Sequence, residues 1–492
     1  MPPSGYLSAS SIESCLQYLS STYPAICQLI VMPEQSREGR TIRAVKIASD
    51  GGGDRRAVLF IGGVHARELV NPDALVGLGL RLCQAYTGSS GLTFGGQTYP
   101  ATTIKLIVDA MDVFILPLVN PDGRVYVQSP TGDPWWRKNR SPNPGLPCYG
   151  VDLNRNYDFL WSATIGSTSS DSCSETFHGP AAFSEPETRN VRWMLDNFPS
   201  IRAMMDVHSY MELVLHPWGD DELQTTDPGM NFMNAAYDGL RGNVGDSVYR
   251  EYMPTADRDW FVNTGNKVRD AIAAVNGNSY TVEQAIYLYP TSGTSKDYAY
   301  SRHFVDATKR PVYAYTLETG TEFQPAFPGA ADLMNEIMSG LVQFCLQSMC
   351  VAEEVAEGTE LADSLADLRA FRDQELLASV AGRRWVSLLE EHTGELLQAA
   401  AADPDLRRHA VEVLGRVAAI VSSRDEPAPR AFDDDVIRGV EQLAQRIERH
   451  AGPGLKDTLN EVRAELGRLR GKTVREAVGL EGYPVLSSPQ ER

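Results

Sequence analysis

The chain lacks the features of several large protein classes. It has no apolar run of about 18 residues or more, the length that a membrane-spanning helix requires. Its first residues, Met1 to Tyr6, contain neither a basic nor an apolar segment, so no signal peptide is visible. With 45 Lys and Arg against 64 Asp and Glu, the net charge is -19. The sequence therefore predicts no membrane span and argues against nucleic acid as a partner.

Cysteine is also scarce. The 492 residues include only 7 cysteines, too few for a fold built on disulfides, and none of them forms a Cys-x-x-Cys zinc knuckle. The odd number leaves at least one cysteine free or paired between chains. No internal repeat of fixed period is present, which argues against a solenoid or propeller.

The composition changes after about residue 350. Residues 1–350 alternate between strand-like and helix-like segments, which predicts an α/β domain. Residues 351–492 are rich in Ala, Leu, Glu and Arg, and apolar residues recur there every three or four positions, as in amphipathic helices. We expect a catalytic domain over 1–350 and an all-α domain of unknown role over 351–492. The helical tail could either self-associate or bind a protein partner.

The first domain shows clear element signals. Helices are expected over 11–18, 71–85, 187–196 and 331–346, and strands over 41–48, 57–61, 113–116, 203–207 and 312–317. Asn71 is expected to cap its helix, with Pro72 in the first position. Asn120-Pro121-Asp122-Gly123 reads as a turn. The Pro- and Gly-rich residues 128–180 form a long loop of the kind that usually carries function.

One segment suggests a metal site. In Val64-His65-Ala66-Arg67-Glu68 a histidine and a carboxylate lie three residues apart, directly after the apolar run 57–61 and two glycines. Both side chains are good zinc ligands. The motif would lie at the carboxyl end of a buried strand, where α/β sheets place their sites. A His-x-x-Glu pair alone is equally consistent with a surface pair.

A catalytic zinc needs a third protein ligand and keeps one open position. The histidines available in the first domain are His65, His178, His208, His216 and His303. His208 is preferred because it ends an apolar strand, although a lone histidine in that position is often structural.

The motifs that follow resemble, in order, those of the zinc carboxypeptidase A-like metallopeptidases. The resembling segments are His65-Ala66-Arg67-Glu68, Trp136-Arg137-Lys138-Asn139-Arg140, Asp152-Leu153-Asn154-Arg155-Asn156, His208-Ser209-Tyr210, Tyr289-Pro290-Thr291-Ser292-Gly293 and Leu317-Glu318-Thr319-Gly320. The resemblance covers roughly residues 6–350 and leaves the C-terminal region outside. It implies the fold of that family, an α/β fold with a mixed eight-stranded sheet flanked by helices.

The resemblance also implies a peptide hydrolase. His65, Glu68 and His208 would hold one Zn2+ per chain, and the zinc would activate a water molecule. Glu318 would act as the general base on that water, and Arg137 would stabilise the oxyanion. A zinc metallocarboxypeptidase acting on the C-termini of peptides or proteins is therefore expected.

Further residues would bind the substrate. By the same resemblance, Asn154, Arg155 and Tyr289 would hold the terminal carboxylate, which a guanidinium can bind bidentately. Arg67 would be an auxiliary substrate-binding arginine. Asp152 would accept a hydrogen bond from the far nitrogen of His65.

The resemblance also pairs Cys148 with Cys173 in a loop disulfide. A disulfide is typical of an oxidising, extracellular compartment, whereas the missing signal peptide indicates the cytoplasm. The sequence leaves the compartment open.

Lys296 departs from the family pattern. It occupies the position, just before Asp297, that sets the side-chain pocket in the resembling enzymes. A lysine at the pocket floor would attract a carboxylate and reject Lys or Arg side chains, which favours C-terminal Glu or Asp. The alternative is that Lys296 points to solvent.

Two other functions remain open at this stage. One is a cell-wall peptide amidase or a protein deglutamylase with the same chemistry. The other is a catalytically inactive module that binds peptides. The complete set of Glu318, Arg137 and the three ligands favours an active enzyme, because a binding module needs no general base.

Overall fold

The computed structural model describes residues 5–49, 55–326, 329–349, 351–356, 359–364, 367–368, 371–376 and 379–477. The chain divides into two compact units, Met1–Ser348 and Met349–Arg492. Among the described residues, no helix is both long enough and apolar enough to cross a membrane.

The first unit is built on a mixed sheet. Its eight strands are, in spatial order, β1 (Cys27–Val31), β2 (Arg43–Ile47), β6 (Asp112–Leu116), β3 (Ala57–Gly62), β7 (Ile201–His208), β12 (Tyr313–Glu318), β8 (Leu213–His216) and β11 (Thr281–Gln284). Strand β3 runs parallel to β6 and β7, and β7 runs parallel to β12. The carboxyl ends of β3, β7 and β12 therefore meet at one edge. Every residue of β3 is buried, as its continuous apolar run predicts for a strand covered on both faces.

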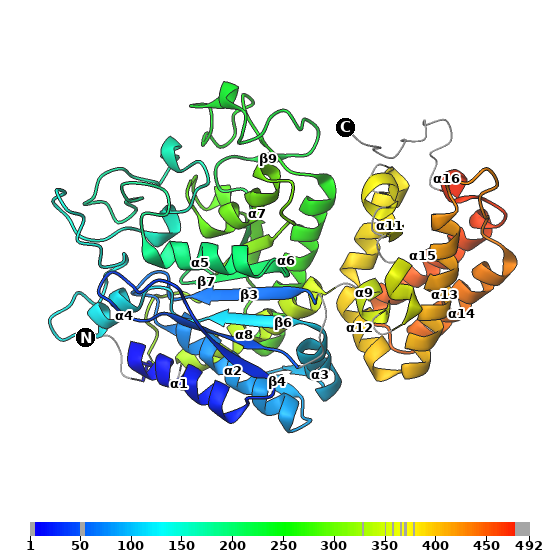
Figure 1. Cartoon of the computed structure of the whole chain (residues 1–492), viewed down its shortest axis with the longest axis horizontal. Coiled ribbons are helices and arrows are strands. Elements are labelled where there is room, and N and C mark those ends of the chain that lie inside the picture. Colours follow the sequence, from blue (N-terminus) through cyan, green and yellow to red (C-terminus); the bar gives the residue numbers. More distant parts are fainter. Residues whose placement is uncertain are drawn as a thin grey trace. The chain divides into compact units, whose positions relative to one another are not determined.

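Helices cover both faces of this sheet (Figure 1). One group contains α1 (Ala9–Thr22), α2 (Val70–Thr87), α3 (Ala101–Ala110), α6 (Thr255–Asn276) and α8 (Gly329–Ser348), which pack against one another. The opposite face carries α5 (Pro186–Asn197) and α7 (Ser295–Val305). The smaller sheets are β4 (Leu92–Phe94) with β5 (Gln97–Tyr99), and β9 (Leu223–Gln224) with β10 (Glu251–Tyr252). The predicted α/β fold with a mixed eight-stranded sheet is confirmed.

Two predictions about local structure are wrong. The segment after Asn120 is not a simple turn but starts α4 (Pro121–Gln128), with the Asn120 side chain accepting a hydrogen bond from the Gly123 N–H at 2.9 Å. Asn and Pro favour both a turn and a helix start, so the dipeptide alone does not separate them. Asn71 does not cap α2, which already begins at Val70. Its buried side chain accepts hydrogen bonds from residues at the carboxyl edge of the sheet instead.

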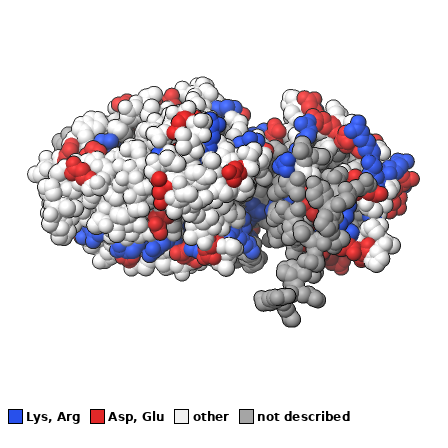
Figure 2. Space-filling model, turned by 90° about the horizontal axis from the view of Figure 1, so that it is seen from above, with Lys and Arg blue, Asp and Glu red and all other residues white. Residues whose placement is uncertain are grey.

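The second unit is helical. Its helices are α9 (Val351–Ala356), α11 (Val380–Glu391), α12 (Thr393–Ala402), α13 (Pro404–Ser422), α14 (Asp434–Glu448), α15 (Pro453–Leu469) and α16 (Val474–Ala477). The side chains of Asp403 and Asp433 cap α13 and α14. Val436 of α14 packs with Ile420 and Val421 of α13, so the predicted apolar stripe of α14 faces a core. Acidic and basic side chains are interspersed on the face of the molecule that Figure 2 shows.

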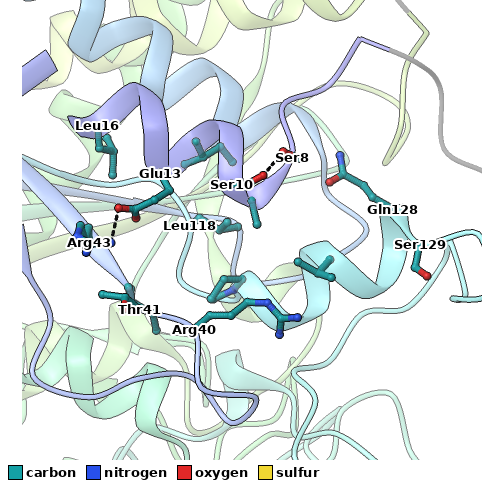
Figure 3. A pocket seen from close by; sticks show the side chains of 15 residues that line it. Ser8, Ser10, Glu13, Leu16, Arg40, Thr41, Arg43, Leu118, Gln128 and Ser129 are labelled. Atoms are coloured by element: carbon teal, nitrogen blue, oxygen red, sulfur yellow. Dashed lines mark hydrogen bonds and ion pairs between the residues drawn. The ribbon is translucent and has the colours of Figure 1, made fainter. Parts of the chain in front are cut away.

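A cavity of about 640 Å3 lies against α1 in the first unit (Figure 3). Its walls combine apolar side chains, such as Ile12 and Leu16 of α1 and Leu118, with polar and charged ones. Its charged residues are already paired, since Glu13 binds Arg43 and Arg40 binds Asp122. No histidine or cysteine lines it, so the residues with metal or acid–base chemistry lie elsewhere.

Candidate metal centre and active site

The three residues predicted to bind zinc lie together. His65 and Glu68 belong to the loop between β3 and α2, and His208 is the last residue of β7. Because β3 and β7 are parallel neighbours, their carboxyl ends bring these side chains to one point. The potential ligand atoms all lie within 4.8 Å of one another, and all three residues are buried.

The hydrogen-bond pattern around the histidines fits a cation. Nε2 of His65 lies 3.0 Å from Oδ1 of Asp152, and Nε2 of His208 lies 2.9 Å from Oδ1 of Asp206. Ring protons on these two far nitrogens, which face carboxylates, would leave both Nδ1 atoms free to bind a cation. The two Nδ1 atoms are nevertheless only 3.0 Å apart, and each faces a carboxylate oxygen of Glu68, at 2.7 Å from His65 and 3.1 Å from His208.

Two imidazole nitrogens and two carboxylate oxygens that converge on one point are stabilised by a positive charge at their centre. Two imidazole nitrogens and a carboxylate are a common ligand set for catalytic zinc. Burial opposes a positive charge on His208, yet Asp206 and Glu68 raise the pKa of that histidine well above its usual value. The same negative potential favours a bound metal cation, so the residues present fit zinc.

Glu318 lies beside this triad. It is the last residue of β12 and pairs with His208 across the parallel β7–β12 ladder. Burial raises the pKa of Glu318 to about 8, against the lowering effect of His208. Its neighbour Thr319 fixes the strand end by donating from its backbone N–H to the carbonyl of His208 at 2.9 Å.

Asp152 connects the metal ligands to Arg137. Its Oδ1 faces His65, while its Oδ2 accepts hydrogen bonds from Nε and Nη2 of Arg137 at 3.1 and 3.0 Å. Burial disfavours the charged guanidinium, but the Asp152 carboxylate outweighs this effect and raises the pKa of Arg137. One buried carboxylate therefore orients a predicted ligand and the predicted oxyanion-stabilising arginine together.

The predicted carboxylate-binding residues form a second group. The side chain of Asn154 accepts a hydrogen bond from the Ser295 N–H at 2.9 Å, which ties the long loop to the start of α7. Arg155 donates to the Asn154 carbonyl at 2.7 Å and to the Ser167 hydroxyl at 2.9 Å. The Arg155 guanidinium lies 5.9 Å from the ring of Tyr289, which is 40% exposed.

Arg67 lies over the ring of Phe323, at 4.3 Å from its centre, and donates to the Trp135 carbonyl at 3.2 Å. Burial, and next the positive charge of Arg137, lower the pKa of Arg67. The two arginines are therefore within electrostatic reach of each other, and Nη1 of Arg67 also lies 3.4 Å from Oε2 of Glu175.

This arrangement agrees with the comparison to known sequences. The sequence profile of the family described as zinc carboxypeptidase matches residues 12–337.

The chain belongs to the zinc carboxypeptidase family.

Individual relatives show how far this similarity extends. The chain is 32% identical to the zinc carboxypeptidase of Simulium vittatum over 314 residues, which cover 64% of this chain and 85% of that protein. It is 34% identical to carboxypeptidase B of Helicoverpa zea over 227 residues, 45% of this chain and 48% of that protein. The chain thus spans about half the length of the Helicoverpa zea relative.

Solved structures show the same fold. Carboxypeptidase A from Helicoverpa armigera matches with a TM-score of 0.51 at 24% identity, covering 69% of this chain and 74% of that structure. Bovine thrombin-activatable fibrinolysis inhibitor, solved in complex with a tick carboxypeptidase inhibitor, matches with a TM-score of 0.53 at 22% identity. The match covers 70% of this chain and 97% of that structure.

Lys296 is buried, so the alternative that it points to solvent is wrong. It lies in the first turn of α7, and its Nζ donates to Oδ2 of Asp297 at 2.8 Å and to Oγ1 of Thr294 at 3.4 Å. Thr294 also donates to the same Asp297 oxygen at 2.7 Å. The lysine is therefore held back against its own helix by two neighbours.

The disulfide between Cys148 and Cys173 is present, with 5.0 Å between the Cα atoms. Nearby, the ammonium of Lys138 donates to the carbonyls of Ser172 and Ser174 at 2.8 and 3.0 Å. Because Lys138 follows Arg137, these bonds attach the disulfide loop to the segment that carries the arginine.

Two residues at the site were missed in the sequence. Asp206, which faces Nε2 of His208, lies two residues earlier on β7, and the two-residue period of a strand is a signal that could have found it. Asn71, interpreted as a helix cap, instead accepts hydrogen bonds from the hydroxyls of Ser209 and Thr319 at 3.2 and 3.1 Å. It thereby ties together the ends of β7 and β12.

Proposed function

We propose that this chain is a zinc-dependent carboxypeptidase with one zinc ion per chain, hydrolysing the C-terminal peptide bond of peptides and proteins. The convergence of His65, Glu68 and His208 on one point beside Glu318 carries the proposal. A bound zinc supplies a Lewis acid and lowers the pKa of a water molecule to about 7.

The chain's own residues perform the remaining steps. Glu318 accepts a proton from the attacking water and returns it to the leaving amine, and its place at the end of β12 beside His208 supports both transfers. Arg137 stabilises the negative charge that develops on the carbonyl oxygen. Asp152 keeps the Arg137 guanidinium oriented before the substrate arrives, which lowers the reorganisation needed in the transition state.

Arg155, Asn154 and Tyr289 confer the requirement for a free C-terminus. The Nε of Arg155 is buried and has no hydrogen-bond partner among the described residues. This supports a guanidinium whose remaining hydrogen bond is accepted by the substrate carboxylate. Arg67 serves as an auxiliary substrate-binding arginine.

A ladder assay tests the activity. A peptide with a free carboxyl terminus should lose residues one at a time in mass spectra, whereas the same peptide with an amidated terminus should remain intact, because it offers no carboxylate to Arg155. The amidated peptide is the matched control. Cleavage inside the chain, or equal shortening of both peptides, would show an endopeptidase or an amidase instead.

We further propose that Lys296 gives a preference for C-terminal Glu or Asp. Two of the three ammonium N–H groups contact Asp297 and Thr294 among the described residues, which leaves one for a substrate carboxylate. A side chain with positive charge would meet this buried ammonium and be rejected.

Peptides that end in Glu, Phe or Lys and are otherwise identical test this preference. We expect Glu to be released fastest, by about tenfold or more in kcat/KM, and Lys slowest. Lys296→Met should remove the advantage of Glu, whereas Lys309→Met, which removes a lysine paired with Asp196 after α7, should not. Faster release of Phe or Lys than of Glu by the unmodified enzyme would disprove the preference.

A further inference from the structure

Asp206 is a carboxylate in the middle of the sheet. It lies on β7, two residues before His208, and the strands β3 and β12 pair with it on both sides, at Ile61 and Thr316. Its side chain is fully buried. An apolar side chain would suit such a strand, and a buried carboxylate is costly unless polar partners surround it. The contacts of Asp206 are therefore informative.

The two oxygens of Asp206 face different parts of the site. Oδ2 accepts a hydrogen bond from the Ser295 hydroxyl at 2.5 Å. Oδ1 lies 2.9 Å from Nε2 of His208, and neither of these two buried atoms hydrogen-bonds elsewhere among the described residues. Because the two atoms are not aligned for a hydrogen bond, this second contact is electrostatic. One carboxylate thus contacts both a predicted zinc ligand and the first residue of α7.

Ser295 continues the connection toward the predicted substrate-binding residues. Its backbone N–H donates to Oδ1 of Asn154 at 2.9 Å, while its hydroxyl is bound to Asp206. Ser295 is buried, so both bonds are shielded from solvent. Lys296 follows directly in the first turn of α7. The positions of the Asn154 side chain and of the pocket lysine therefore both depend on Ser295.

Asn154 leads back to the other predicted histidine ligand. Its backbone N–H donates to Oδ1 of Asp152 at 3.0 Å, and the same oxygen lies 3.0 Å from Nε2 of His65. At the metal centre, the Nδ1 atoms of His65 and His208 are 3.0 Å apart. These contacts close a ring of side chains through His65, Asp152, Asn154, Ser295, Asp206 and His208.

We propose that Asp206 and Ser295 are positioning residues that hold the zinc site and the site for the substrate's terminal carboxylate as one unit. This inference rests on the proposed carboxypeptidase function. Asp206 is fixed by the central strand, so its bond to Ser295 sets where α7 begins, and Ser295 in turn orients Asn154. The same carboxylate faces the His208 ring. Loss of the bond between Ser295 and Asp206 therefore weakens zinc binding and substrate binding together.

Ser295→Ala tests this connection, because it removes the hydroxyl that binds Asp206 and keeps the backbone N–H that binds Asn154. The zinc dissociation constant, measured by competition with a chelator of known affinity, should rise about tenfold, as is typical when the partner of a zinc ligand is disturbed. At saturating zinc, KM for a peptide with a free carboxyl terminus should rise about fivefold, and kcat should change less than about twofold.

Ser301→Ala is the matched control. Ser301 is a buried serine on the same helix, and its hydroxyl donates to the Tyr298 carbonyl at 3.0 Å. Both substitutions remove one buried hydroxyl from α7, so a general loss of stability would lower the thermal midpoint of both variants. Only Ser295→Ala should change the zinc dissociation constant and KM.

Asp206→Asn approaches the same contact from the strand and does not depend on the folding of the serine variant. Asparagine keeps the shape of the side chain and an acceptor for Ser295 but removes the charge that faces His208. The zinc dissociation constant should again rise about tenfold. The double variant should lose little more zinc affinity than the weaker-binding single variant, because both changes act through one contact. Additive losses would show two independent effects and contradict the proposal.

A zinc dissociation constant within about twofold of the unmodified value in Ser295→Ala would overturn the proposal, and so would a rise in only one of the two constants. The proposed function fails in a different way. An unmodified enzyme that shortens no peptide is not a carboxypeptidase, whereas the zinc affinities of the variants still decide whether Asp206 and Ser295 support the metal site.

Discussion

Replacing Glu318 by Gln is expected to lower kcat by about a thousandfold. Glutamine keeps the size of the side chain but can neither accept a proton from the water nor return it to the leaving amine. Glu318 ends β12 beside His208 and is therefore close to the predicted zinc ligands. KM and the zinc content should change little, because the three predicted ligands are retained.

The matched control is Glu322→Gln, which alters an exposed glutamate four residues further along the chain. It should leave kcat within about twofold of the unmodified enzyme, as is usual for surface positions. Kinetics with a Glu-ending peptide and metal analysis of both variants provide the comparison. If Glu318→Gln retained more than about a tenth of the activity, another group would have to act as the base.

Replacing His208 by Ala is expected to remove both the zinc and the activity. Three protein ligands are the usual minimum for catalytic zinc, and the loss of one leaves a site with only His65 and Glu68. The unmodified chain should contain one zinc ion, and the variant should lose most of it on dialysis. Treatment of the unmodified enzyme with a chelator should have the same effect on activity, and added zinc should restore activity only in the unmodified enzyme.

The thermal midpoint provides a second readout for the metal. A ligand that binds only the folded state stabilises it, so the zinc-loaded enzyme should melt at a higher temperature than the chelated enzyme. His303→Gln is the control, because His303 lies on α7 and interacts with the Tyr300 carbonyl, away from the triad. It should retain zinc. An unchanged zinc content in His208→Ala would show that the metal is held elsewhere.

The C-terminal unit, Met349–Arg492, lies outside the matched family region, which ends at residue 337. Its helices bury their apolar stripes in cores of their own, such as the cluster around Val436 and the cluster of Ala444, Leu455 and Leu459. The amphipathic pattern of these helices is therefore explained by packing, and self-association or binding of a partner remains a prediction.

The sequence by itself determined the fold class and the chemical inventory of this protein. A continuous apolar run such as that of β3 predicts a buried strand, because a strand covered on both faces has no polar positions. The ordered motifs from His65 to Glu318 predict the family. These signals are local in the chain, and each can be read from a few adjacent residues.

Only the tertiary structure decided which partners each side chain has. Asp152 joins His65 to Arg137, Asn71 leaves its expected cap position to tie two strand ends together, and Lys296 is buried against Asp297. The physical reason is the same in each case. Whether a polar side chain caps a helix, faces solvent or binds a buried partner depends on burial and on the neighbours around it, and this environment exists only after the sheet and its loops have packed.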